Sequence, residues 1–237
     1  MITNFKQFVN ENLLVPRNLE GRKEKLRHMN IKLLSQEVIE CEDLVFDESF
    51  MDIDAKFVKL KKVNGTIFLK GGLWTEIPEW LKDVEIIGDF YCADNKLTTL
   101  KNSPKKVEGV FYCSNNELIS LEGCPENVGR FNCSHNLLTS LEYCPKTDNR
   151  GFDCSYNELI NLKYCPKNIK GYFGCRNNKL TSLEGGPEKV EIFNCMHNKL
   201  KSLEGCPKHI EENFYCDFNT IKLKLPDYVK LKGEFIN

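Results

Sequence analysis

Residues 111–130 have the sequence FYCSNNELISLEGCPENVGR, and the next twenty, 131–150, have the sequence FNCSHNLLTSLEYCPKTDNR. Both stretches begin with Phe-Xaa-Cys-Ser, place an asparagine five residues after the phenylalanine, and continue to Leu-Glu-Xaa-Cys-Pro. Similar stretches start every 20 or 21 residues between Phe90 and Phe214. A short, fixed period predicts a solenoid, in which each copy forms one turn and buries its apolar side chains against its neighbours.

The copies, called repeats 1 to 7 below, keep the same residue types at the same places. Phenylalanine opens each repeat, at Phe90, Phe111, Phe131, Phe152, Phe173, Phe193 and Phe214. Cysteine follows two residues later, at Cys92, Cys113, Cys133, Cys154, Cys175, Cys195 and Cys216. Because alternate residues of a strand share a face, we expect Phe and Cys to point inward and the residue between them to point outward.

An asparagine five residues after each phenylalanine marks the place where the chain leaves the strand. These residues are Asn95, Asn116, Asn136, Asn157, Asn178, Asn198 and Asn219. A side-chain amide at this place can satisfy backbone groups that have lost a strand partner, so stacked copies are predicted to form a structural ladder. The rest of each repeat is short and contains proline, which predicts an extended or 3-10-like convex side rather than a helix.

The chain has 12 cysteines, and seven of them fall in the inward column. A free thiol packs as a small hydrophobe, so we expect these side chains to fill the core. Disulfides and zinc are the alternatives, because neighbouring strands bring Cα atoms near bridging distance and thiolates bind zinc. Neighbouring thiols point the same way, no two cysteines are closer than nine residues, and no secretory signal is recognised. We therefore expect reduced thiols, no metal and a cytoplasmic location.

The repeats resemble leucine-rich repeats, which have the pattern L-x-x-L-x-L-x-x-N-x-L and a period of 20–29 residues. The resemblance covers residues 63–237, including a degenerate first copy with Ile67 and Leu69 inward and Gly72 in place of asparagine. Phe235 would start a truncated last strand. The resemblance implies an α/β-type solenoid with a parallel β-sheet of about nine strands on its concave face and a mostly irregular convex side.

Residues 1–62 do not fit the repeat and are expected to form a helical N-terminal region and cap. Apolar residues lie at helical spacing from Ile2 to Leu13, and a second helix is predicted from Leu19 to Glu40. Residues 17–32 are mostly basic and residues 37–54 are acidic, which is typical of solvated faces. A cap is expected here because the first turn of a solenoid otherwise exposes its core.

Residues 5–11, Phe-Lys-Gln-Phe-Val-Asn-Glu, resemble the short leader of internal head proteins of large tailed bacteriophages. That resemblance implies packaging into a phage head and cleavage after Glu11, with Val9 departing from the usual Ile or Leu. The alternative is a plain amphipathic helix. The repeats also resemble arrays encoded by such phages and repeats of secreted bacterial effectors, and a phage origin implies a location in the host cytoplasm or the virion.

The composition argues against several classes of function. With 33 basic and 34 acidic residues the net charge is -1, which argues against binding of nucleic acid or of an anionic membrane. No apolar run reaches the roughly 18 residues that would span a bilayer. The chain contains no Gly-Xaa-Ser-Xaa-Gly, His-Glu-Xaa-Xaa-His, phosphate-loop or dinucleotide-binding motif, so we expect neither catalysis nor a cofactor.

The outward residues of the concave face vary between repeats and form the predicted partner-binding site. They are Tyr91, Tyr112, Asn132, His135, Asp153, Tyr156, Asn194, His197 and Tyr215. Aromatic, histidine and amide side chains are typical of contact surfaces, so we expect a monomeric, non-catalytic module that binds a protein. Two alternatives stay open: a carbohydrate ligand, which also suits aromatic platforms, and a purely structural role as pairs across neighbouring repeats.

Overall fold

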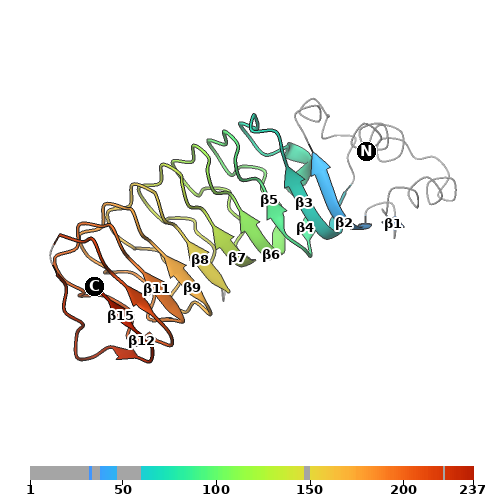
Figure 1. Ribbon diagram of the computed structural model, residues 1–237. Coiled ribbons are helices and arrows are strands. Elements are labelled where there is room, and N and C mark those ends of the chain that lie inside the picture. The colour runs from blue at the N-terminus through green and yellow to red at the C-terminus, as the bar shows by residue number, and fades with distance from the viewer. Residues whose placement is uncertain (1–31, 34–37, 47–59, 147–149, 221) are drawn as a thin grey trace.

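The computed structural model describes residues 32–33, 38–46, 60–146, 150–220 and 222–237. The repeats stack side by side in an elongated array that runs from the blue and green N-terminal strands to the red C-terminal strands (Figure 1). Over the described residues, no helix is long and apolar enough to cross a membrane. The predicted repeat solenoid is therefore confirmed in its general architecture.

Each repeat contributes a short strand to one parallel sheet. These strands are β3 (Lys62–Leu69), β5 (Phe90–Tyr91), β6 (Lys106–Tyr112), β7 (Val128–Asn132), β8 (Gly151–Asp153), β9 (Tyr172–Gly174), β11 (Ile192–Asn194), β13 (Phe214–Tyr215) and β15 (Phe235–Ile236). Equivalent residues lie opposite each other, so Phe90 pairs with Phe111 and Phe111 with Phe131. The period of the sequence thus becomes the register of the sheet.

A second parallel pairing precedes the phenylalanine in many repeats and was not predicted from the sequence. It includes β4 (Glu85–Ile86), β10 (Lys189–Val190), β12 (His209–Ile210) and β14 (Lys230–Leu231). In β6 and β7 the two pairings belong to one strand, with a register shift between Val107 and Val110. Between these paired positions β6 advances by three residues while β7 advances by two, which is a β-bulge. The bulge accommodates the change from the 21-residue spacing of Val107 and Val128 to the 20-residue spacing of Val110 and Arg130.

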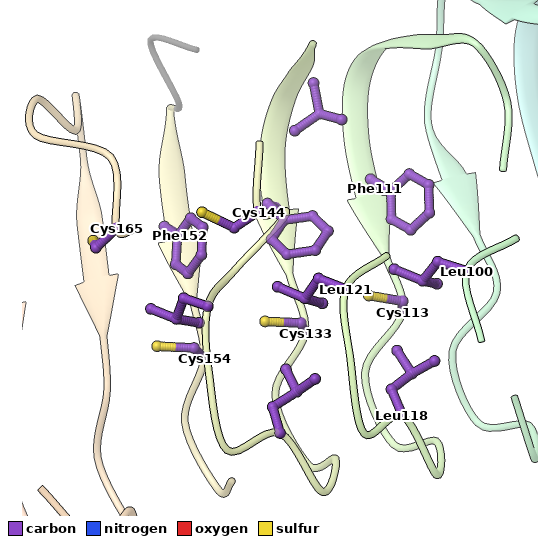
Figure 2. Packing of buried hydrophobic residues seen from close by; sticks show 14 of the residues in the cluster. Leu100, Phe111, Cys113, Leu118, Leu121, Cys133, Cys144, Phe152, Cys154 and Cys165 are labelled. Carbon is purple, nitrogen blue, oxygen red and sulfur yellow. The ribbon is translucent and has the colours of Figure 1, made fainter. Parts of the chain in front are cut away.

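The core has the predicted columns of phenylalanine, cysteine and leucine. Figure 2 shows Phe111, Cys113, Leu118 and Leu121 pointing into the same interior, with the equivalent side chains of the next repeats beside them. All seven repeat phenylalanines are fully buried, and the rings of neighbouring repeats lie with centroids 5.2–5.8 Å apart. This stacking buries a continuous apolar interior, which is the principal stabilising contribution in a repeat fold.

The cysteines are part of this interior. The structure describes eleven cysteine side chains, all of them free thiols, and ten are buried. Burial away from water raises the pKa of the Cys154 thiol well above its usual range, and the neighbouring thiol of Cys133 raises it further. The thiol of Cys154 also donates a hydrogen bond to the carbonyl of Gly174 in the next repeat, at 3.3 Å. These features describe thiols that pack as apolar groups.

The asparagine ladder is also present. The side-chain nitrogen of Asn157 donates to the carbonyls of Cys133, Cys154 and Ser155 at 3.0–3.2 Å. Its side-chain oxygen accepts from the backbone N–H of Leu138 at 3.0 Å. Equivalent bonds recur at Asn95, Asn116, Asn136, Asn178, Asn198 and Asn219. Each amide therefore links its own repeat to the previous one.

The side of the array opposite the sheet is irregular, as predicted. Over the described residues its regular structure is one short 3-10 helix, Glu79–Leu81, and the remaining connections are turns and bends. Trp80 of that helix packs on Phe46 with ring centroids 4.8 Å apart. In repeats 1 to 6 the connection has a residue with positive φ twelve positions after the phenylalanine, and this residue is glycine in three of them, at Gly123, Gly185 and Gly205, and Asn102, Tyr143 or Tyr164 in the others.

The prediction of a helix from Leu19 to Glu40 is wrong in the residues of that segment that the structure describes. Those residues belong to β1 (Lys32–Leu33) and β2 (Val38–Phe46), which are antiparallel to each other, and β2 runs parallel to β3. Val38, Ile39 and Glu40 pair with Lys62–Asn64 of β3, so sheet pairing prevails here over helical spacing. The predicted helix over residues 2–13 and the leader at residues 5–11 lie outside the described residues.

Candidate binding face

The outward side chains of β3 to β13 form three rows along one face of the array, called the sheet face below. The upstream row holds the residue before each phenylalanine, the middle row holds the residue after it, and the turn row holds the residue four positions after it. The predicted site residues occupy the middle row at Tyr91, Tyr112, Asn132, Asp153, Asn194 and Tyr215 and the turn row at His135, Tyr156 and His197. The fold therefore places all nine on one side of the sheet.

An aromatic stack occupies the N-terminal end of the middle row. The rings of Tyr91 and Tyr112 are nearly parallel, with centroids 4.5 Å apart. Phe68 of β3 extends the stack, with its ring centroid 4.6 Å from that of Tyr91. The Lys70 ammonium lies 5.0 Å from the centroid of the Phe68 ring. Phe68 was not among the predicted site residues, although it follows Ile67 as each tyrosine follows a repeat phenylalanine.

Asp89, in the upstream row, holds this stack in place. One carboxylate oxygen accepts the backbone N–H of Val110 at 2.7 Å, and the other accepts the Tyr91 hydroxyl at 3.2 Å. Partial burial and the neighbouring Asp89 carboxylate raise the pKa of Tyr91 to about 12. The phenol is therefore fixed in its neutral, hydrogen-bonding form at neutral pH.

The central and C-terminal residues of the middle row are hydrogen-bonded within their own repeats. The side chains of Asn132, Asp153 and Asn194 each accept the backbone N–H two residues further on, at 3.0–3.2 Å. Near the C-terminal end the Asn213 amide donates to the Tyr215 hydroxyl at 3.0 Å. These bonds fix the polar groups in one orientation, as Asx-type turns do.

The turn row adopts the left-handed conformation in every repeat. Its φ angles lie between 51° and 58°, at Asp94, Asn115, His135, Tyr156, Asn177, His197 and Phe218. Asparagine, aspartate and histidine tolerate this region, whereas bulky aromatic residues rarely adopt it. His135, Tyr156 and His197 of this row were predicted as outward residues, but their backbone conformation was not predicted.

Stacked pairs across neighbouring repeats compensate for this conformation. His135 stacks on Tyr156 with centroids 4.0 Å apart, and His197 stacks on Phe218 at 4.4 Å. On the far side of the first pair the Arg176 guanidinium lies 5.0 Å from the Tyr156 ring. The turn row therefore shows the pairing across neighbouring repeats that the structural alternative predicted, while His135, His197 and Phe218 also remain exposed.

The sheet face offers stacking, hydrogen bonding and apolar contact. Within the described part of the chain, no group of three or more His, Cys, Asp and Glu side chains has the arrangement of a metal site. A scan of protein-family models and a search of curated proteins found no match to this chain. The function is therefore inferred below from the sequence pattern and the geometry of this face.

Proposed function

We propose that the protein is a non-catalytic leucine-rich-repeat module that binds a protein partner on its sheet face. The observation that carries the proposal is the partly exposed aromatic stack of Phe68, Tyr91 and Tyr112, next to oriented polar groups. Large aromatic side chains surrounded by hydrogen-bonding groups are typical of the residues that dominate protein–protein binding energy. A solenoid presents such residues on a rigid support, which reduces the entropy lost on binding.

The geometry of the stack favours a protein over a carbohydrate. A sugar ring packs on the flat face of an aromatic side chain, but both faces of Tyr91 are covered by Phe68 and Tyr112. The remaining face of Phe68 lies against Lys70. The ring edges, the Tyr112 hydroxyl and the one face of Tyr112 that points away from Tyr91 are left for a partner, and this mixture suits the apolar and polar side chains of a protein surface.

The resemblance of the repeats to phage-encoded arrays extends the proposal. In that setting the partner is a host or capsid protein, and the module acts in the host cytoplasm or the virion. The leader-like residues 5–11 supply the second candidate role, packaging into a phage head. A mass shift that corresponds to cleavage after Glu11 in protein recovered from infected cells would support that role, whereas an intact N-terminus would count against it.

Affinity capture with matched variants tests the proposed site. We expect a protein captured from the host lysate by the wild-type chain to bind Tyr112→Ala about 5 to 150 times more weakly, the equivalent of about 1–3 kcal/mol. Lys163→Ala, an exposed change on the opposite side of the array, serves as the control and should bind like the wild type. Equal affinity of the purified partner for wild type and Tyr112→Ala would show that the aromatic stack is not part of the binding site.

A further inference from the structure

Two glycines replace outward side chains in the centre of the sheet face. Gly151 stands in the upstream row of repeat 4, and Gly174 stands in the middle row of repeat 5. Long side chains from neighbouring positions lie over both. Atoms of Arg130 come within 3.3–3.6 Å of the place where a Gly151 side chain would start, and the Tyr172 ring and hydroxyl come within 2.5 Å of the equivalent point at Gly174. Arg130 and Tyr172 therefore lie along the sheet in this region.

Polar groups gather around these glycines. A carboxylate oxygen of Asp153 lies 2.8 Å, and the Tyr172 hydroxyl 2.5 Å, from the same point above Gly174, so these two oxygens are at most 5.3 Å apart. Burial, and then the Asp153 carboxylate, raises the pKa of Tyr172 to about 12, while Arg176 and a contact with Ser155 lower it. Tyr172 is therefore a neutral phenol beside a carboxylate and a serine hydroxyl.

Two of these groups, on Ser155 and Arg130, lack partners in the unbound protein. The Ser155 hydroxyl is buried in a residue that is 2% exposed, and it makes no hydrogen bond of normal geometry. The Nε–H group of Arg130 is buried without an acceptor. Among the ion pairs formed by the described residues, none joins Arg130 to Asp153. Polar groups that lose water without gaining a partner destabilise the folded state.

The repeat itself shows that the fold does not require these residues. Val110 and Ile192 occupy the upstream row in other repeats, where repeat 3 has Arg130. Ala93 occupies the position of Ser155 in repeat 1. Because apolar residues serve the same structural positions elsewhere in the same sheet, packing alone does not explain Arg130 and Ser155.

We propose that Arg130, Asp153, Ser155 and Tyr172 form a polar subsite that binds the main chain of an extended peptide segment. This inference rests on the proposed function, in which the sheet face binds a protein, and it specifies the part of the partner that is recognised. Arg130 donates to a peptide carbonyl, Asp153 accepts a peptide N–H, and the two hydroxyl groups can do either. On ligand binding, Arg130 changes conformation enough to present its buried N–H.

The mixture of groups determines the ligand class. An anionic ligand would meet the Asp153 carboxylate, and a cationic ligand would meet the Arg130 guanidinium, whereas a neutral peptide group offers both an acceptor and a donor. The subsite extends from repeat 3 to repeat 5, or about 10 Å at the usual spacing between strands. An extended peptide rises about 3.3 Å per residue, so about three of its residues span this distance.

Stability measurements separate a binding role from a structural one. Arg130→Val and Ser155→Ala introduce residues that other repeats already hold at these positions, Val110 in repeat 2 and Ala93 in repeat 1. We expect the melting temperature of both variants to equal or exceed that of the wild type, because each removes an unsatisfied buried group. Asn136→Ala, which breaks the ladder, is the control that should melt lower. A fall in the Arg130→Val and Ser155→Ala variants as large as that of the control would overturn the proposal.

Binding measurements test the ligand class. A displayed library of random seven-residue peptides is selected on the full-length wild-type chain, and the enriched peptides are synthesised with and without N-methyl groups on the main chain. We expect at least tenfold weaker binding to Arg130→Val and to Asp153→Asn, unchanged binding to Lys163→Ala, and at least tenfold weaker binding of the peptides methylated at the contacting residues.

The outcomes distinguish this inference from the proposed function. If binding is lost in Tyr112→Ala but unchanged in Arg130→Val, the subsite is refuted and the binding face stands. If no peptide is enriched, the peptide subsite is refuted while a folded protein partner for the face stands. If binding survives every change on the sheet face, both are refuted. If N-methyl groups have no effect, main-chain recognition is refuted.

Discussion

Replacing Asn157 with alanine tests how much the asparagine ladder stabilises the solenoid. Asn157 is 6% exposed, and its amide makes four hydrogen bonds to the backbone. The three carbonyls that it contacts each keep another donor, from Asn136, Asn178 and the backbone N–H of His135. The N–H of Leu138 loses the acceptor that the ladder provides and stays buried. The main loss is therefore one orphaned donor, accompanied by three weakened carbonyl contacts.

The expected loss is about 3 kcal/mol of unfolding free energy, of which the orphaned N–H contributes about 1–3 kcal/mol and the weakened contacts the rest. Urea denaturation followed by circular dichroism measures the total. Hydrogen exchange of the Leu138 amide reports whether the damage is local to this part of the array.

Two further variants make the test specific. Asn219 is half-buried, and its bonds to the Cys195 and Asp217 carbonyls are longer, at 3.3 and 3.5 Å, although its bond to the Cys216 carbonyl is 2.6 Å. Because this site is more open to water, Asn219→Ala should lose only about 1 kcal/mol. Asn157→Asp keeps the shape but turns a carboxylate toward three carbonyls, which should raise its pKa in the folded protein. Its added destabilisation should therefore be complete at neutral pH and disappear as the pH falls below about 4. A loss below 1 kcal/mol for Asn157→Ala, or equal losses at both asparagines, would refute the ladder argument.

Three other outcomes follow from the same geometry. Native protein without reductant should react with thiol reagents at only about one or two sites, because burial raises the thiol pKa values. Denatured protein should expose all 12 thiols, and a clearly lower count after denaturation would indicate disulfides or bound metal. Of the 8 tyrosines, Tyr91 and Tyr172 should ionise near pH 12 in an ultraviolet titration, and ionisation of every tyrosine near pH 10 would contradict this. Because the folded pKa values of these two lie above the unfolded value of 10.0, their contribution to stability should be complete below pH 10 and lost toward pH 12. A chain that starts at Asn12 should melt within about 2 °C of the full chain if residues 1–11 act as a leader rather than a packed helix, and a drop of about ten degrees would contradict the leader.

The sequence predicted the inward part of the fold well because each repeat imposes the same packing demand. Phe152, Cys154 and Asn157 each have a counterpart in the other repeats, so all seven repeats indicate the same inward-facing positions. A single amphipathic segment carries no such redundancy. The helix predicted from Leu19 to Glu40 therefore failed at Lys32–Leu33 and at the start of β2, where the strand pattern that ends at Phe46 was obscured by acidic residues between its apolar ones.

The candidate site was predicted as a set of positions but not as a set of contacts. Strand alternation alone placed Tyr91, Tyr112 and Asp153 in one row. The positive φ of the turn row had a signal in the sequence, because aspartate, asparagine and histidine fill five of its seven positions, but Tyr156 and Phe218 concealed it. The positions of Arg130 and Tyr172 over glycines depend on side-chain conformation, which a repeat pattern does not specify.

The bulge between Val107 and Val110 also has a consequence for the way such an array can change length. In this fold a one-residue difference between the two pairings of a repeat leaves every inward phenylalanine in register. That segment is therefore the place at which a protein engineer can join repeats of unequal length, or insert a residue, while the interior keeps its order.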